Sequence, residues 1–190
     1  MDLLFPEVES IRRLLRPLQC DWWVAGGWAV DMFLGRQTRA HQDLEIALAR
    51  ADQVQLLALP GVAGLEYLEG GEKHRWRGQW LELPMHELHA RFSTGEFVEV
   101  LLNEFVGEHW VYRRNRDIRL PRAAFDGAMH LPIEVVLLYK SKSPRAWDEH
   151  DFHSVLPRLD AEQRRWLAEA IALDSPAHPW LQQLRTGGAA

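Results

Sequence analysis

The chain has 190 residues, of which 47% are hydrophobic, and this suits one domain, or one domain with a small appendage, around an ordinary core. The net charge of −5 argues against a broad nucleic-acid-binding surface, and the single cysteine, Cys20, excludes an internal disulfide. No apolar run approaches the ~20 residues of a membrane span, and Met1 is not followed by a basic region and an apolar leader. We therefore expect a soluble, cytoplasmic protein that binds neither membrane nor nucleic acid.

The first half of the chain predicts helices and short strands in alternation. Apolar residues at helical spacing predict a helix over residues 6–18. A buried strand over 21–25, a helix over 28–34, a strand over 44–48 and a helix over 52–59 follow. From residue 65 the period becomes that of strands, which we expect over 65–68, 75–80, 88–92 and 97–102, with weaker candidates at 110–112 and 118–120.

The pattern becomes helical again after Pro132. It predicts helices over 133–142, 147–156, from a capping box at Asp160 to 173, and over 179–184, followed by a frayed end from Thr186. We therefore expect an α+β fold, a mixed β-sheet core with flanking helices and a small helical C-terminal region. The expected division is a core domain over 1–131 and a helical region over 132–190.

The most informative segment joins the turn Gly26-Gly27 to the acidic pair Asp43 and Glu45. Two glycines before a helix let the backbone approach a phosphate, and the free N–H groups of the helix start point at that anion. Residues two apart on a strand share one face, so both carboxylates are expected side by side. Hard oxygen ligands beside a phosphate cradle suit a Mg²⁺–nucleotide site, although the pair taken alone favours solvent-facing acids on a strand.

The same segment reads GGWAVD and then GRQTRAHQDLE, and this combination resembles the nucleotidyltransferase superfamily, in particular its aminoglycoside/lincosamide adenylyltransferase-like family. The resemblance implies a nucleotidyltransferase-like fold and a Mg²⁺-dependent enzyme. Such an enzyme transfers a nucleoside monophosphate, here AMP from ATP, to a hydroxyl of a small-molecule acceptor such as an aminoglycoside-like antibiotic. Asp43 and Glu45 would hold one or two Mg²⁺, with Glu where the family more often has Asp.

A third carboxylate is expected on a neighbouring strand, and Glu99 is our candidate because it stands between Val98 and Val100. The resemblance gives this position two roles, metal ligand or general base. The alternative is a solvent-facing residue on an edge strand. Glu104 is the second candidate, although it is expected to lie past the end of the strand.

The residues expected to bind the nucleotide are Gly26, Gly27, Arg39 and Lys140. The glycines would cradle the phosphates. Arg39 is expected to pair with a carboxylate or with phosphate. Lys140 either extends to solvent from its apolar helix or meets the phosphates, with Lys142 as the second candidate.

Four further residues are expected to position the site. We expect Asp31 and His41 to orient the loop, and Asp148 and Asp151 to have structural roles at a helix start.

Other features leave the acceptor and the activity open. Five acids of the strand region either line a pocket for a cationic aminoglycoside or form a solvated rim: Glu66, Glu69, Glu72, Glu82 and Glu87. His86 and His89 are three apart, face opposite sides of a strand, and so do not predict a zinc site. The alternative function is a catalytically weak, antitoxin-like protein that binds nucleotide or a protein partner. The sequence does not determine the oligomeric state.

Overall fold

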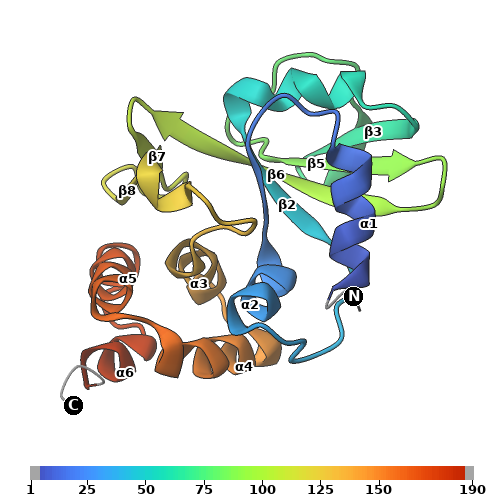
Figure 1. Ribbon diagram of the computed structural model, residues 1–190. Coiled ribbons are helices and arrows are strands. Elements are labelled where there is room, and N and C mark those ends of the chain that lie inside the picture. The colour runs from blue at the N-terminus through green and yellow to red at the C-terminus, as the bar shows by residue number, and fades with distance from the viewer. Residues whose placement is uncertain (1–4, 187–190) are drawn as a thin grey trace.

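The computed structural model describes residues 5–186, and it consists of a mixed β-sheet with helices on both sides (Figure 1). The elements in chain order are α1 (Pro6–Leu15), β1 (Trp22–Val24), α2 (Gly26–Leu34), β2 (Glu45–Ala49), the 3₁₀ helix η1 (Arg50–Ala58), β3 (Val62–Glu69), β4 (Glu72–Arg75), β5 (Glu87–Phe92), β6 (Phe97–Val106), β7 (His109–Val111), β8 (Arg119–Pro121), the 3₁₀ helix η2 (Arg122–Phe125), α3 (Ile133–Ser141), α4 (Ala146–Val155), the 3₁₀ turn η3 (Leu156–Arg158), α5 (Ala161–Asp174) and α6 (Trp180–Thr186). The expected α+β fold class is confirmed. The frayed end expected from Thr186 onward lies outside the described residues, except for Thr186 itself, which ends α6.

The strand order is β1-β2-β6-β5-β3-β4, and β7 and β8 continue from the far half of β6. Strands β2 and β6 run parallel, and the other paired strands of residues 5–186 run antiparallel. A parallel pair needs a long crossover connection, and here residues 50–96 supply it. The pairing register places Glu45 beside Glu99, so two strands far apart in sequence bring these acids together.

The side chains of β2 alternate between two hydrophobic cores. Ile46 and Leu48 belong to the core under α1 and η1, whereas Ala47 belongs to the core that the C-terminal helices cover. Side chains two apart on a strand share a face. Glu45 therefore lies on the face of Ala47, the side where α2 and α3 pack.

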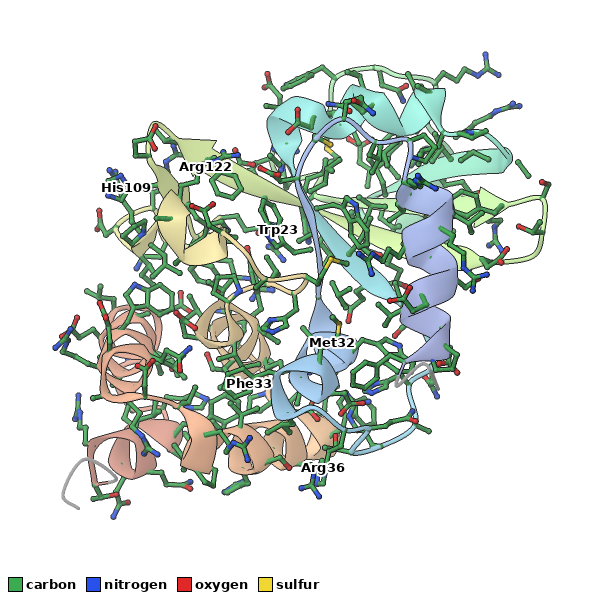
Figure 2. All side chains as sticks on the ribbon, in the orientation of Figure 1. Trp23, Met32, Phe33, Arg36, His109 and Arg122 are labelled. Atoms are coloured by element: carbon green, nitrogen blue, oxygen red, sulfur yellow. The ribbon has the colours of Figure 1, made fainter. Side chains whose placement is uncertain are left out.

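The second core spans the boundary expected between the two parts of the chain. It contains Trp23 of β1 and Trp110 of β7 together with Leu137 of α3 and Trp180 of α6. Helix α3 is buried almost all round, as expected for a helix at the centre of a core. Trp23 points from β1 toward η2, where its indole N–H donates to the Phe125 carbonyl at 3.0 Å (Figure 2).

Three elements differ from their predicted form. The segment over 52–59 is a 3₁₀ helix starting at Arg50. The strand expected over 75–80 ends at Arg75, because the side chain of Trp76 turns into the core and its indole N–H donates to the Gln79 carbonyl. Strand β6 continues to Val106 because its second half pairs with β7. No helix among residues 5–186 is long and apolar enough to cross a membrane.

Candidate active site

Three glutamates and a histidine gather where the neighbouring strands β2, β6 and β5 meet. Glu45 lies in register with Glu99, and Glu99 lies in register with His89. The His89 imidazole Nε2 is 2.7 Å from Glu87 Oε1 and 3.9 Å from Glu99 Oε1. We call Glu45, Glu87 and Glu99 the acidic edge.

The acidic edge is electrostatically strained. Burial, together with the charges of Asp43, Glu99 and Glu87, raises the pKa of Glu45 to about 7, although Lys140 opposes the shift. Burial and the charges of Glu87 and Asp43 also raise the pKa of Glu99. Like charges in a partly desolvated place disfavour ionisation, and a bound cation would remove that penalty. The donor set therefore fits a divalent metal ion with oxygen ligands.

Two residues of the acidic edge also form a possible metal-binding group with His89. One ligand atom from each of Glu87, His89 and Glu99 lies within 4.8 Å of the others. We expected His86 and His89 to face opposite sides of one strand. In the structure His86 lies just before β5, so only His89 is on that strand. His89 instead joins the acidic edge.

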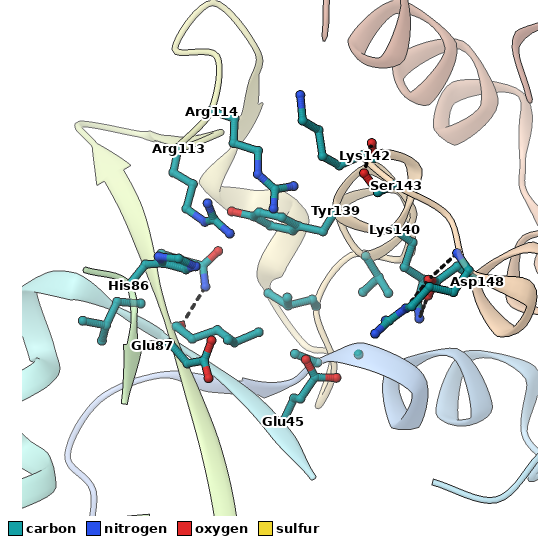
Figure 3. A pocket seen from close by; sticks show the side chains of 18 residues that line it. Glu45, His86, Glu87, Arg113, Arg114, Tyr139, Lys140, Lys142, Ser143 and Asp148 are labelled. Atoms are coloured by element: carbon teal, nitrogen blue, oxygen red, sulfur yellow. Dashed lines mark hydrogen bonds and ion pairs between the residues drawn. The ribbon is translucent and has the colours of Figure 1, made fainter. Parts of the chain in front are cut away.

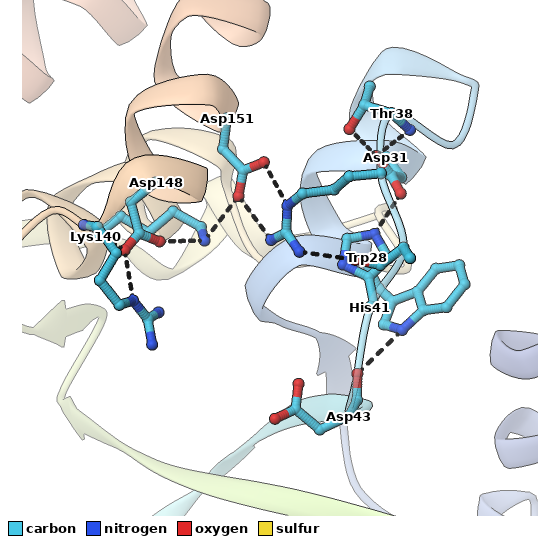
Figure 4. A network of polar contacts seen from close by, with 11 residues as sticks. Trp28, Asp31, Thr38, His41, Asp43, Lys140, Asp148 and Asp151 are labelled. Atoms are coloured by element: carbon cyan, nitrogen blue, oxygen red, sulfur yellow. Dashed lines mark hydrogen bonds and ion pairs between the residues drawn. The ribbon is translucent and has the colours of Figure 1, made fainter.

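Asp43 is not on the strand that carries Glu45, so the prediction that one strand presents both carboxylates is wrong. Strand β2 begins at Glu45, and β1, its partner on one side, ends at Val24 opposite Ile46 before the chain turns into α2. The Asp43 carbonyl accepts from the Trp28 indole N–H at 3.1 Å, and its side chain is exposed (Figure 4). Its charge still raises the pKa of Glu45.

Helix α2 begins at Gly26, directly beside Glu45. Its N-cap, Ala25, supplies no side-chain hydrogen bond, so the first N–H groups of α2 are left for a ligand. Gly26 has a φ of +59°, and a Cβ there would overlap the Glu45 carboxylate. A Cβ at Gly27 would instead strike the side chains of Arg39 and His41 at 2.4–2.5 Å. Gly26 lines the cavity between β2 and α3, whereas Gly27 is buried beneath the loop.

The loop between α2 and β2 is fixed by Asp31, which is fully buried. Its carboxylate accepts from the Thr38 N–H at 2.9 Å, from the Thr38 hydroxyl at 2.5 Å, and lies 2.5 Å from His41 Nε2 (Figure 4). The His41 ring also packs on Trp28, with centroids 4.5 Å apart. These contacts explain physically why the segment needs Trp, Asp, Thr and His at these spacings.

Arg39 connects this loop to the C-terminal helices. Its guanidinium donates to both oxygens of Asp151 at 3.0 Å. Lys140 Nζ lies 2.8 Å from Asp148 and 2.8 Å from Asp151, and Arg145 Nε donates to Asp148 at 2.8 Å (Figure 4). We call these five residues the ion cluster. Arg39 thus pairs with a carboxylate, and Asp148 and Asp151 fix this region.

A cavity of about 440 Å³ opens between the acidic edge and α3 (Figure 3). Its wall includes Gly26, Glu45 and Glu87 on the sheet side, and Tyr139 and Lys140 on the helix side. Of the five acids expected to line an acceptor pocket, Glu87 is the one that lines this cavity. Arg113 and Arg114, from the loop after β7, line it as well.

Glu104 lies inside β6 and not beyond its end. Its carboxylate accepts from the guanidinium of Arg50, which also donates to two backbone carbonyls. This pairing assigns Glu104 to the structure and leaves Glu99 as the acid of β6 at the acidic edge.

Residues 7–79 match the family model of aminoglycoside-2''-adenylyltransferase. No curated protein sequence matches the chain. Among solved structures, ANT(2'')-Ia in complex with adenylyl-2''-tobramycin is 18% identical, with 88% of this chain and 97% of that chain covered and a TM-score of 0.57. The solution structure of ANT(2'')-Ia is 17% identical, covering 95% and 96%, with a TM-score of 0.58. The lincomycin-bound lincosamide adenylyltransferase LnuA is 14% identical, covering 82% and 98%, with a TM-score of 0.50.

Residues 7–79 of the chain therefore resemble the aminoglycoside-2''-adenylyltransferase family, and most of the chain shares the fold of these solved adenylyltransferases. At these identities the solved structures establish the fold alone, and the family match covers the part of the molecule from α1 to β4. The resemblance seen in the sequence is confirmed, as is the nucleotidyltransferase class of enzyme.

The sequence analysis names Glu87 as one of the acids of an acceptor pocket or rim, but it misses two residues that face the cavity, Arg113 and Arg114. The consecutive arginines after the aromatic strand residues Trp110 and Tyr112 were the available signal, because arginine stacks readily on aromatic faces.

Proposed function

We propose that the chain transfers AMP from ATP to a hydroxyl group of a small-molecule acceptor, with release of pyrophosphate. The observation that carries the proposal is the register of β2 and β6, which sets Glu45 beside Glu99 next to the uncapped start of α2. A Mg²⁺–nucleotide site needs such an arrangement: carboxylates for the metal and free N–H groups for the phosphates.

Glu45 and Glu99 would hold Mg²⁺, with Asp43 and Glu87 near enough to add to the negative potential. When bound, the metal would neutralise charge that develops on the attacking and leaving oxygens. The raised pKa of Glu45 favours its protonated form when no cation is bound, so binding of a metal to the ionised carboxylate releases protons.

The nucleotide's phosphates would lie against the first turn of α2 and the ion cluster. Lys140 lines the cavity, and its ammonium carries three donors, of which two meet Asp148 and Asp151. The third is left for a phosphate oxygen. Arg39, held in a bidentate pair with Asp151, would hold the helices in place and act on the nucleotide through Lys140.

In the reaction, the acceptor oxygen forms a bond to the α-phosphorus while the bond from that phosphorus to the bridging oxygen breaks. The pair of electrons leaves with pyrophosphate, and the acceptor's hydroxyl proton passes to Glu99. A raised pKa suits Glu99 for this general-base role. His89, 3.9 Å from Glu99 and 2.7 Å from Glu87, would orient the base.

Two measurements test the proposal. Calorimetry of ATP, CTP, GTP and UTP binding with Mg²⁺, and with EDTA as the control, tests the nucleotide site and shows which base it prefers. One structural relative binds adenylyl-2''-tobramycin and another binds lincomycin. Pyrophosphate release with tobramycin or lincomycin therefore tests transfer to an antibiotic of either kind. Failure of Mg²⁺ to promote nucleotide binding would contradict the proposal.

A further inference from the structure

One wall of the cavity carries two adjacent guanidinium groups. Arg113 and Arg114 follow Tyr112, the first residue after β7, and both line the cavity. Their guanidinium carbons lie 5.4 and 5.6 Å from the centre of the Tyr139 ring. Arg114 also donates to the Tyr112 hydroxyl at 3.1 Å. The rings of Tyr139 on α3 and Tyr112 after β7 therefore hold these groups at the cavity wall (Figure 3).

Within residues 5–186 neither arginine forms an ion pair. Arg113 is half-buried, and its burial, with the nearby charge of Arg114, lowers its pKa, although Tyr139 and Glu87 oppose the shift. Burial, with the charge of Arg113 as a smaller cause, also lowers the pKa of His86 beside it, which disfavours a third positive charge at this wall. Two like charges that face a cavity and form no ion pair of their own are stabilised by an anionic ligand.

The position of the two arginines indicates whether this anionic ligand is the nucleotide or the acceptor. Figure 3 shows Lys140 and Asp148 on one side of Glu45, and Arg113 with His86 and Glu87 on the other. In nucleotidyl transfer the attacking and leaving oxygens lie roughly in line across the phosphorus. With pyrophosphate against Gly26 and Lys140, the acceptor enters from the side of the arginines.

The charges of the cavity also disfavour a polycation there. Five basic side chains line it, namely Arg113, Arg114, Lys140, Lys142 and Arg145, against the acids Glu45, Glu87 and Asp148. Asp148 is already paired with Lys140 and Arg145. The remaining acids, Glu45 and Glu87, belong to the acidic edge that would face the metal.

We infer that Arg113 and Arg114 bind an anionic group, a carboxylate or a phosphate monoester, carried by the acceptor. This inference rests on the proposed nucleotidyl transfer. It predicts that the acceptor is an anionic hydroxy compound and not a polycation. Planar guanidinium groups match carboxylate and phosphate oxygens in bidentate fashion, which gives both affinity and orientation of the acceptor hydroxyl.

The test separates the acceptor from the nucleotide by using three hexoses that differ mainly in charge. The protein is saturated with Mg²⁺ and a non-hydrolysable ATP analogue, and glucuronate, glucose and glucosamine are titrated by calorimetry at constant ionic strength. We expect glucuronate to bind at least about tenfold more tightly than the other two, as loss of one charge-assisted pair implies. Arg113→Gln/Arg114→Gln should remove this preference, and Arg113→Lys/Arg114→Lys should keep part of it.

The matched control is Arg116→Gln, because Arg116 is exposed in the same loop and does not line the cavity. It should leave all three affinities unchanged. Affinity for the ATP analogue should change by less than about threefold in every variant, since the pair lies on the acceptor side.

Two results would overturn the inference. The first is a loss of about tenfold or more in analogue affinity in Arg113→Gln/Arg114→Gln with the hexose order unchanged, which would place the triphosphate on the arginines. The second is a wild-type protein that does not prefer glucuronate, including one that binds none of the hexoses. Absence of Mg²⁺-dependent analogue binding would contradict the proposed function instead, and the glucuronate preference can still be measured without nucleotide.

Discussion

The ion cluster and the acidic edge are both groups of charged side chains next to one cavity, yet their carboxylates shift in opposite directions. In the ion cluster, burial alone would raise the pKa of Asp148 and Asp151. Hydrogen bonds from Arg145 and Lys140 to Asp148, and from Arg39 and Lys140 to Asp151, lower these pKa values overall. At the acidic edge burial and mutual repulsion raise the pKa of Glu45 and Glu99.

This difference separates a structural task from a chemical one. The ion cluster satisfies its charges within the protein and joins the loop before β2 to α3 and α4. The acidic edge leaves its negative charge without a cation, so it gains most from a ligand. Perturbed carboxylates of the second kind gather at functional sites.

The largest effect is expected at the acidic edge. Glu45→Gln keeps the shape of the side chain and removes its charge, so it should lower pyrophosphate release by at least about 10³-fold through loss of a metal ligand. Circular dichroism should show an unchanged fold. The matched control is Glu108→Gln, which changes an exposed glutamate outside the cavity. Activity of Glu45→Gln within a few-fold of wild type would contradict the metal assignment.

The next largest effect is expected in the ion cluster, and on stability. Asp151 is fully buried between Arg39 and Lys140. Asp151→Asn leaves these two cations short of their shared partner and should lower the free energy of unfolding by about 3–5 kcal/mol, the usual cost of breaking a buried pair. Urea denaturation measures this change.

The control for Asp151 is the exposed pair of Asp21 and Arg122. Asp21→Asn should cost only about 0–1 kcal/mol, because solvent screens a surface pair. Equal costs for the two variants would show that the ion cluster is no more than a surface network.

Lys140 stands where the two regions meet, and its variant is expected to have an intermediate effect. Lys140→Met should raise KM for ATP by about tenfold while changing KM for the acceptor little, because the lost contact acts on nucleotide binding. The control is Lys142→Met. Lys142 also lines the cavity, but its ammonium lies 4.0 Å from Asp174 and is not part of the ion cluster. If Lys140→Met lowers stability and leaves KM for ATP unchanged, Lys140 belongs to the structure alone.

The comparison also explains what the sequence could and could not predict. The α+β fold follows from local periods, and the pairing of Gly26 with Glu45 follows from a short segment. The register of Glu45 and Glu99 could be suspected because an acid between two valines needs a reason on its face of the strand. Local patterns did not give the start of β2 at Glu45, which leaves Asp43 outside the strand, or the long β6, which places Glu104 beside Arg50. These depend on contacts between distant segments, as does the meeting of Arg113 and Arg114 with Tyr139.

The smallest expected effect is a pH dependence that distinguishes the two regions without any activity assay. Glu45 has its ordinary pKa of 4.5 in the unfolded chain and about 7 in the folded protein. Between these values the folded protein holds a proton that the unfolded chain has released, so the free energy of unfolding falls as pH rises through that window. Above pH 7 the penalty is complete. We expect about 1–2 kcal/mol, less than the full ~1.4 kcal/mol per pKa unit, because solvent reaches the side chain.

Urea denaturation of wild type and Glu45→Gln between pH 5 and 8, without metal, measures this penalty as a difference that cancels the other titrating groups. Glu45→Gln should be the more stable protein at pH 8 and lose that advantage near pH 5. Adding Mg²⁺ should reverse the trend for wild type alone, because the ion binds the ionised carboxylate and its binding strengthens as pH rises. Parallel stability curves for the two proteins, with or without Mg²⁺, would mean that Glu45 carries no strain and that the acidic edge is as well compensated as the ion cluster.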